Sequence, residues 1–258
     1  QKDAMHNGTF TPNSAQMDGV ADATISPATG SPKKTTAPLF DELYSKAPAA
    51  KVEIDNLAGE VAAANGGIVA RAPLKNVDTA RNKIAPEYAD PDWDGGNPNK
   101  IKDLARNTVV VHDSQIQDVA SQLGDGGANV KTIKTNTNKA PGEGDLGYTG
   151  VNTTLKTENG LVAEIQVNSP EMIFAKEKPV DARRILKDDE LYDEIAAKAG
   201  VEGGMGHTYY DEYRKLDPMD PATLEQRIEI ENKSRAYYET VRENAGGSRV
   251  PRPALEDN

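Results

Sequence analysis

The stretch from Gly147 to Ser169, GYTGVNTTLKTENGLVAEIQVNS, carries the clearest structural pattern of the chain. Large or β-branched residues alternate with polar ones on both sides of Glu158-Asn159-Gly160, and Asn and Gly tolerate the positive φ of a tight reversal. We therefore predict a β-hairpin. Its return strand has an apolar face of Leu161, Ala163, Ile165 and Val167, and an opposite face of Val162, Glu164, Gln166 and Asn168.

Glu164 and Gln166 thus lie side by side on a strand whose packing would hold them still. Solvated polar faces are common in antiparallel sheets, so the alternation alone favours an exposed strand face over a functional site. Two neighbouring segments change this weighting. One is Gly147-Tyr148-Thr149-Gly150-Val151-Asn152, just before the turn, and the other is His207-Thr208-Tyr209-Tyr210.

In this order, the three segments resemble the synthetase domain of the RelA/SpoT family, which makes alarmone nucleotides. That family carries Gly-Tyr-Arg-Ser-x-His, then Glu-x-Gln-x-Arg-Thr, then a His with a Tyr three residues on. The resemblance covers roughly residues 65–215. It implies an α/β (α+β) fold, with a mixed β-sheet flanked by helices in a nucleotidyltransferase-like arrangement. It also implies transfer of the β,γ-pyrophosphate of ATP to the 3′-hydroxyl of a purine nucleotide.

The resemblance implies a pair of catalytic carboxylates that also bind Mg²⁺, the implied cofactor. The family has Asp-x-x-Gly-x-Arg ahead of a central strand, and Asp103 matches its magnesium ligand. Arg106 stands where the Gly is expected, and Thr108 stands where the Arg is expected. Glu164 is implied to bind Mg²⁺ or to accept the proton of the attacking hydroxyl.

Polyphosphate binding needs several cations, among which Arg can make bidentate contacts. The family places an Arg, a Lys, a Ser and another Lys around a strand end and a helix start. Arg71, Lys75 and Lys83 follow that order here, with Thr79 near the Ser position, and Arg106 is a fourth candidate for ATP binding. Without the later motifs, a solvated basic helix would be the preferred interpretation, because surface Lys and Arg are common.

The acceptor nucleotide is assigned to a second group of residues by the same resemblance. Tyr148 would stack on the acceptor base, while Asn152, Gln166 and His207 would support the acceptor or its phosphates. Stacking on an aromatic ring tolerates any base, so the base itself has to be discriminated by the polar contacts around it.

Three departures from the family pattern concern these polar contacts. Thr149 and Asn168 replace Arg residues, and Asn152 replaces a His. They put the common guanine acceptors in doubt, and we predict an adenine nucleotide. Related toxins include makers of adenosine alarmones and enzymes that pyrophosphorylate the tRNA 3′-CCA end, so a tRNA acceptor is an alternative. A non-catalytic module that binds a nucleotide or a partner, or a structural protein, is a different class of alternative.

Charge and composition limit the partners. The net charge is −11 over 258 residues, and general nucleic-acid binding is not expected because it depends on a basic face. A small nucleotide needs only a local group of cations. The chain has no Cys, and it has no apolar run near the roughly 18 residues of a membrane span. Its three His, at positions 6, 112 and 207, do not form the His-Asp metal motif of the family's hydrolase domain.

The domain organisation follows from shifts in composition. Residues 1–38 are rich in Ser, Thr, Pro and Gly and predict a flexible arm. Residues 39–245 are expected to form the synthetase domain and 246–258 a frayed tail. No signal peptide is visible, and the start at Gln1 indicates that the true N-terminus lies upstream. An unrestrained synthetase on such an arm resembles the C-terminal module of a secreted effector. It would act in the cytoplasm of the producing or target cell and have a cognate immunity protein or antitoxin.

Overall fold

A five-stranded sheet forms the centre of the computed structural model, which describes residues 32–125, 129–134 and 139–252. The strands lie in the order β2 (Ile68–Arg71), β4 (Arg106–Val110), β7 (Val162–Asn168), β6 (Val151–Lys156) and β5 (Asn129–Lys134). β4 runs parallel to β7, and the other neighbours are antiparallel. The expected mixed sheet is therefore confirmed.

The predicted hairpin is formed by β6 and β7. Thr154 lies opposite Glu164, and Asn152 lies opposite Gln166. At the turn, the Thr157 amide donates to the Leu161 carbonyl at 2.9 Å, and Gly160 adopts a φ of 84°. Such a positive φ costs a residue without a Cβ little, so the sequence chemistry and the turn geometry agree.

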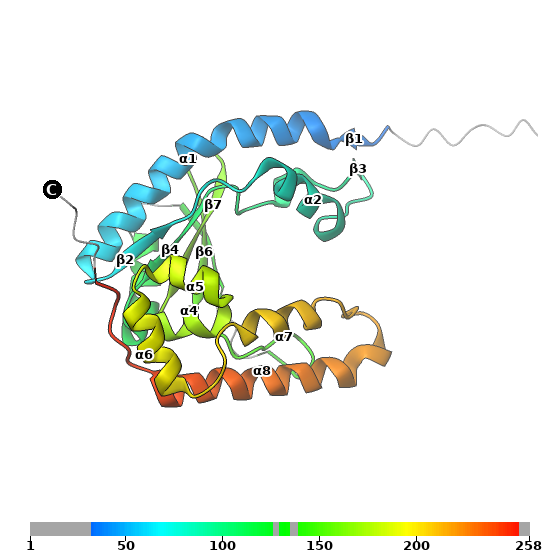
Figure 1. Cartoon of the computed structure of the whole chain (residues 1–258). Coiled ribbons are helices and arrows are strands. Elements are labelled where there is room, and N and C mark those ends of the chain that lie inside the picture. Colours follow the sequence, from blue (N-terminus) through cyan, green and yellow to red (C-terminus); the bar gives the residue numbers. More distant parts are fainter. Residues whose placement is uncertain (1–31, 126–128, 135–138, 253–258) are drawn as a thin grey trace, which may run out of the picture. The chain divides into compact units, whose positions relative to one another are not determined.

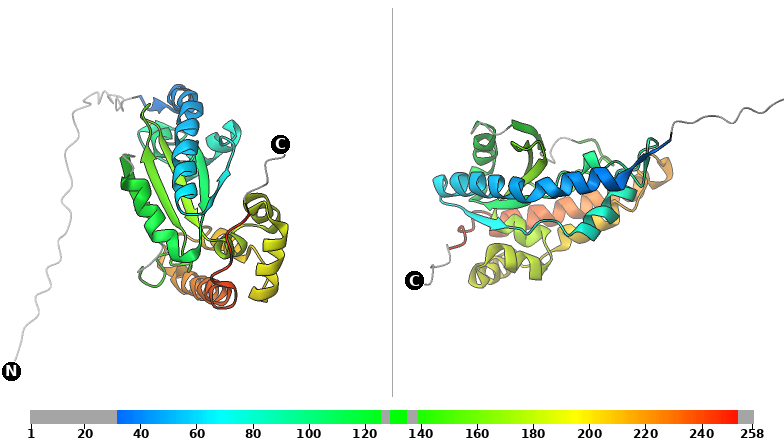
Figure 2. Two further views of the ribbon diagram at one scale, coloured as in Figure 1. Left: turned by 90° about the vertical axis from the view of Figure 1, so that its left-hand side faces the viewer. Right: turned by 90° about the horizontal axis from the view of Figure 1, so that it is seen from above.

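One face of the sheet is apolar and is covered by α1 (Thr36–Ala64) and α3 (Ile116–Asp125) (Figure 2). The sequence pattern predicts a short helix over residues 40–44 and a second helix over 47–65, but the structure has one helix of 29 residues that continues through Pro48. The reason lies in its buried stripe of Phe40, Ala47, Ala50, Ile54, Ala58 and Ala62. This stripe keeps helical spacing across the proline, and its burial outweighs the missing backbone hydrogen bond.

The other face is partly covered by five helices that follow β7, as Figure 1 shows. They are α4 (Pro170–Lys176), α5 (Pro179–Leu186), α6 (Asp189–Ala199), α7 (Met205–Tyr213) and α8 (Leu224–Ala245). The sequence pattern predicts one helix over residues 180–199 that ends at Gly200. The structure has two helices there, because Lys187 adopts a left-handed conformation and Asp188 caps α6. The Glu, Lys and Arg spacing in residues 221–243 predicts a solvated helix, but α8 buries Tyr237, Tyr238 and Val241 in a second core.

The ends of the domain differ in part from expectation. The described part of the predicted arm includes β1 (Lys34–Thr35), which pairs with β3 (Trp93–Asp94), while residues 1–31 lie outside the described residues. After α8, the chain is held rather than frayed: Arg249 donates to Asp188 at 2.6 Å, and Ser248 is buried. Residues 253–258 lie outside the described residues. No helix within the described residues is long and apolar enough to cross a membrane.

Candidate functional site

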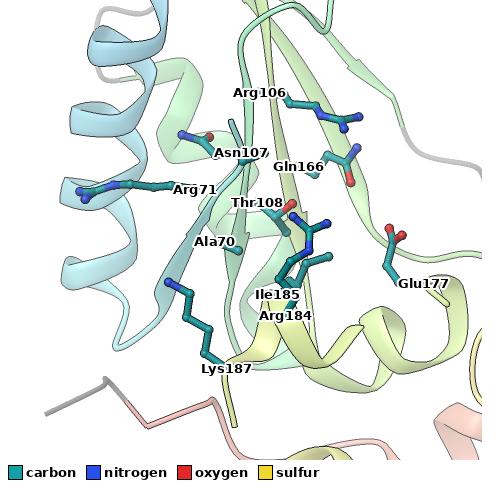
Figure 3. A pocket seen from close by; sticks show the side chains of 11 residues that line it. Ala70, Arg71, Arg106, Asn107, Thr108, Gln166, Glu177, Arg184, Ile185 and Lys187 are labelled. Carbon is teal, nitrogen blue, oxygen red and sulfur yellow. The ribbon is translucent and has the colours of Figure 1, made fainter. Parts of the chain in front are cut away.

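A polar patch lies on the face of the sheet opposite α1. Residues directly opposite each other on neighbouring strands point to the same face, and the register gives two such rows across β4, β7 and β6. The rows are Arg106, Glu164 and Thr154, and next to them Thr108, Gln166 and Asn152. Figure 3 shows the side chains of Arg106, Thr108 and Gln166 on this side of the strands. The hairpin thus brings the predicted Asn152, Glu164 and Gln166 together.

Glu164 is oriented through Gln166. The side-chain amide of Gln166 donates to Glu164 Oε1 at 2.7 Å, and its carbonyl Oε1 accepts from Lys176 Nζ at 3.0 Å. This second bond fixes which end of the Gln166 amide faces Glu164. Burial disfavours the charge of Lys176, but nearby groups, chiefly Tyr148 and Glu177, raise its pKa well above the ordinary range. Lys176 was not identified from the sequence, because it lies in a helix outside the three motifs.

Asp103 is the meeting point of two of the predicted cations. Lys75 Nζ lies 2.8 Å and Lys83 Nζ 3.0 Å from its Oδ2. Lys83 comes from α2 (Val77–Glu87), whose start is capped by the side chain of Asn76. Burial opposes the charged form, but hydrogen bonds and charge from the two lysines lower the pKa of Asp103 below its usual value. It is thus a carboxylate at neutral pH.

The two predicted metal ligands come from adjacent parts of the backbone. The Glu164 amide donates to the Ala105 carbonyl at 3.1 Å, two residues after Asp103. Oδ1 of Asp103 is buried and has no hydrogen-bond partner among the described residues, which is the condition of an oxygen available to a cation. The described residues contain no group of three or more His, Cys, Asp or Glu that could hold a metal. The unpartnered Oδ1 of Asp103 therefore fits a Mg²⁺ ion that takes its other oxygens from phosphates and water.

The remaining ATP-binding candidates lie on opposite faces of the sheet. Arg106 lines a cavity over the polar patch, beside Gln166 (Figure 3). Arg71 pairs with Asn107 in the register, on the α1 side, and its guanidinium approaches Gly59 of α1. Arg71 also lines this cavity, but its guanidinium points toward α1 and not toward Arg106. The reason is the two-residue period of β2, which turns Arg71 away from the polar face.

The same cavity is lined by two cations that the sequence did not single out. Arg184 and Lys187, at the end of α5, face the patch from the helical side, as Figure 3 shows. They stand in a segment that appeared to be one continuous helix. Their position depends on the break at Lys187, which has a φ of 50°. The local sequence pattern does not predict a non-Gly residue with positive φ. The contribution of Arg184 and Lys187 to the cavity therefore could not be predicted from the motifs.

Tyr148 is buried beside the patch and is only 7% exposed. Its ring lies 6.1 Å from that of Tyr238, and Lys176 Nζ lies 5.1 Å from its centroid. Burial raises the pKa of its hydroxyl. The predicted stacking on a base therefore requires Lys176 or the surrounding side chains to move away from the ring face.

His207, the last predicted acceptor residue, lies in α7. Its Nε2 is 3.2 Å from Asp211 Oδ2 in the same helix. The end of α7 lies close to α2, since Arg214 Nη1 is 4.0 Å from Glu87 Oε1. His207 thus belongs to a helix and not to the sheet, and no hydrogen bond or ion pair within the described residues joins it to Glu164.

No protein-family model matches the chain. It is 49% identical over 207 residues to the (p)ppApp synthetase toxin Tas1 of Pseudomonas aeruginosa (strain UCBPP-PA14). This match covers 80% of the chain, which spans 43% of that protein. A crystal structure of the type VI effector Tas1 in complex with its immunity protein is 48% identical, with a TM-score of 0.66, covering 79% of this chain and 96% of that one.

At this identity, and with nearly all of the solved Tas1 chain covered, the chain belongs to the Tas1 family.

Proposed function

We propose that this chain is a nucleotide 3′-pyrophosphokinase that transfers the β,γ-pyrophosphate of ATP to the 3′-hydroxyl of an adenine nucleotide. The observation that carries the proposal is the site around Asp103. A buried carboxylate with one unpartnered oxygen holds two lysines, beside a strand that presents Glu164. A structural protein has no need for a buried carboxylate that pairs with two lysines next to a strand that carries a second carboxylate.

The ATP phosphates would be held by the two lysines around Asp103 and by Arg106. Lys75 and Lys83, now paired with Asp103, and Arg106 over the patch supply positive charge that a triphosphate requires. Mg²⁺ bound by Asp103 and Glu164 would neutralise charge that develops on the phosphates. Arg71 is not part of this group, since its guanidinium lies on the other face.

The chemical step needs a base close to the attacking hydroxyl. The 3′-oxygen of the acceptor forms a bond to the β-phosphorus of ATP, the bond from that phosphorus to the α-phosphate oxygen breaks, and AMP leaves. Glu164 takes the hydroxyl proton. Gln166 and Lys176 hold the Glu164 carboxylate in one orientation, through hydrogen bonds of 2.7 and 3.0 Å. A base held in one orientation lowers the entropic cost of reaching the reactive geometry.

The acceptor is proposed to be a small adenine nucleotide. The name of the 49% identical relative supports this base. The chain's Thr149, Asn152 and Asn168 also stand where guanine users of the RelA/SpoT type have basic residues. The net charge of −11 favours a mononucleotide over tRNA, because a long polyanion meets general repulsion that a few local cations must overcome.

The biological role proposed for the chain follows its relatives. One relative is named a toxin, and the solved one is a type VI effector bound to an immunity protein. We propose that this chain is likewise the toxic module of a secreted effector, that it acts in the cytoplasm of a target cell, and that a cognate immunity protein binds it. Depletion of adenine nucleotides would inhibit growth.

The test is a set of parallel reactions. The protein is incubated with ATP labelled in its β,γ-phosphates, Mg²⁺ and one of AMP, ADP, GDP, GTP or tRNA, and a further reaction contains ATP alone. We expect labelled product with the adenine nucleotides, and no product when Mg²⁺ is chelated. Labelling of the tRNA 3′ end without product from free nucleotides, or product from guanine nucleotides alone, would refute the acceptor assignment. If no pyrophosphate is transferred to any of these acceptors, the assignment of the chain as a pyrophosphokinase is wrong.

A further inference from the structure

One stripe of α8 follows the loop that leads into Tyr148. Its members recur every three or four residues and so share a face of the helix. They are Arg227, Glu231, Ser234, Tyr238 and Arg242. The loop comprises residues 142–147, between β5 and β6. The stripe is mostly buried, although its composition would suit a solvated helix.

Glu231 is the centre of this contact. It is 0% exposed, and its two carboxyl oxygens accept hydrogen bonds from the Gly142 amide at 2.7 Å and the Gly144 amide at 2.5 Å. The Gly142 carbonyl in turn accepts from Arg227 and, at 2.7 Å, from the Tyr213 hydroxyl. A buried carboxylate is costly unless its oxygens are satisfied, and here the loop amides satisfy them.

The contacts then continue along the loop to its end. Ser234 Oγ donates to the Leu146 carbonyl at 2.7 Å, and Arg242 Nη1 donates to the Gly147 carbonyl at 2.7 Å. Between these two positions on the stripe stands Tyr238, whose ring packs against Tyr148. One rigid helix thus holds the loop step by step up to the aromatic residue.

The glycines of the loop make this close approach possible. Gly142 and Gly147 have φ angles of 87° and 83°, which other residues adopt at a cost. A Cβ on Gly147 would lie 2.8 Å from the Arg235 Cα atom of α8, and one on Gly142 would collide with Leu224. The loop backbone therefore lies directly on the helix.

We propose that Glu231 is a positioning residue for the acceptor nucleotide: through Gly142 and Gly144 it fixes the loop that places Tyr148. The inference rests on the proposed function, since it takes Tyr148 as the acceptor's stacking partner. The proposal gives Glu231 an effect on the acceptor nucleotide and none on ATP. The contacts of α8 with the loop lead to Tyr148, whereas the ATP cations Lys75 and Lys83 are held by Asp103, which α8 does not contact through these bonds.

The test compares Glu231→Gln with Glu229→Gln, a variant of an exposed glutamate two residues away that contacts Lys233. The glutamine keeps the shape of Glu231 but turns one of its two acceptors into a donor facing an amide. We expect the KM for the adenine acceptor to rise about tenfold, corresponding to about 1.4 kcal/mol, while the KM for ATP stays within about twofold. Hydrogen exchange of residues 142–147 should accelerate in Glu231→Gln and stay unchanged in Glu229→Gln.

Three results would overturn the inference. They are unchanged exchange of the loop in Glu231→Gln, faster exchange with an unchanged acceptor KM, and an equal rise of both KM values. If Glu231→Gln does not fold, Ser234→Ala, which removes only the bond to Leu146, is judged by the same readouts with a smaller expected effect. A wild-type protein without any transfer refutes the proposed function and this inference with it. A transferring wild type with an insensitive Glu231 refutes the inference alone.

Discussion

The Tyr148 hydroxyl donates a hydrogen bond of 2.5 Å to Oδ1 of Asn168, which joins the start of the hairpin to the end of its return strand. Both side chains are buried. A Cβ on Gly150 would overlap this hydroxyl, so the glycine is needed for the contact. In the RelA/SpoT motif an Arg occupies the position of Asn168, so this chain has exchanged a cation for a partner of the tyrosine hydroxyl.

This contact allows the ring and the hydroxyl of Tyr148 to be tested separately. Tyr148→Phe should keep the fold and cost about 1–3 kcal/mol of stability, because it leaves the Asn168 oxygen without a donor. Its kcat/KM for the acceptor should stay within about threefold of wild type, because the stacking ring is retained.

Tyr148→Ala should lower the acceptor kcat/KM by about 10- to 100-fold and destabilise the fold by about 3–5 kcal/mol, as large core truncations do. Both variants are assayed well below their melting temperatures, with the ATP KM as the internal control. A Phe variant as impaired as the Ala variant would show that the hydroxyl, and not stacking, serves the acceptor.

Glu164→Gln tests the proposed base on the same strand. It should abolish nearly all transfer while the melting temperature changes little, since shape is kept while charge and basicity are lost. The matched control is Glu158→Gln in the exposed hairpin turn, which should transfer at the wild-type rate. Product formation is followed with saturating Mg²⁺ and labelled ATP. Wild-type turnover in Glu164→Gln would show that Glu164 is not the base and is only a polar residue of the strand face.

The cations around Asp103 give a further prediction. The structure pairs Lys75 and Lys83 with Asp103 but turns Arg71, which the motifs group with them, toward α1. Lys75→Met and Lys83→Met should each raise the KM for ATP about tenfold or more, because a charge-assisted phosphate contact is lost. Arg71→Met should leave it within about twofold, since its guanidinium lies beside Gly59 on the other face. Steady-state kinetics with varied ATP decides between them. An Arg71→Met variant as impaired as the lysine variants would restore the sequence-based assignment.

The hairpin shows what periodicity can predict. The alternation in 161–168 correctly assigned Ile165 and Val167 to the core and Glu164 and Gln166 to the opposite face. A period of two fixes the face of every residue once the strand is known. The same rule, applied to β2, would have separated Arg71 from the polar patch, had its pairing with β4 been known. That pairing joins residues about 40 positions apart, which no local pattern contains.

Helices were harder to assess for a related reason. The charge pattern of α8 suits a solvated helix, yet Glu231 and Arg227 are buried because they bond to the backbone of a loop about 85 residues earlier. Spacing shows which residues share a face, but not whether the face meets water or amide groups. Lys176 was missed similarly, since its bond to Gln166 depends on how α4 leaves the strand.

Glu171 gives a prediction about pH. Its side chain is 1% exposed, Oε2 has no partner among the described residues, and burial raises the pKa of its carboxyl. The folded state therefore holds the proton more tightly than the unfolded chain, whose Glu pKa is about 4.3. The stability of the neutral form is fully present below that value and is lost as pH rises through the folded pKa.

Glu171→Gln should therefore raise the free energy of unfolding relative to wild type at pH 7, and by much less at pH 4. Comparing the two proteins cancels the opposite contribution of Asp103, whose lowered pKa makes its stabilisation disappear in acid. Urea unfolding at both pH values measures the difference, with Glu60→Gln on the exposed side of α1 as the control, expected to show no such pH dependence. A Glu171→Gln variant that is less stable at pH 7 than at pH 4, relative to wild type, would mean that the ionised carboxylate has a partner in solution. The start of α4 would then supply it, since helix N-termini favour negative charge.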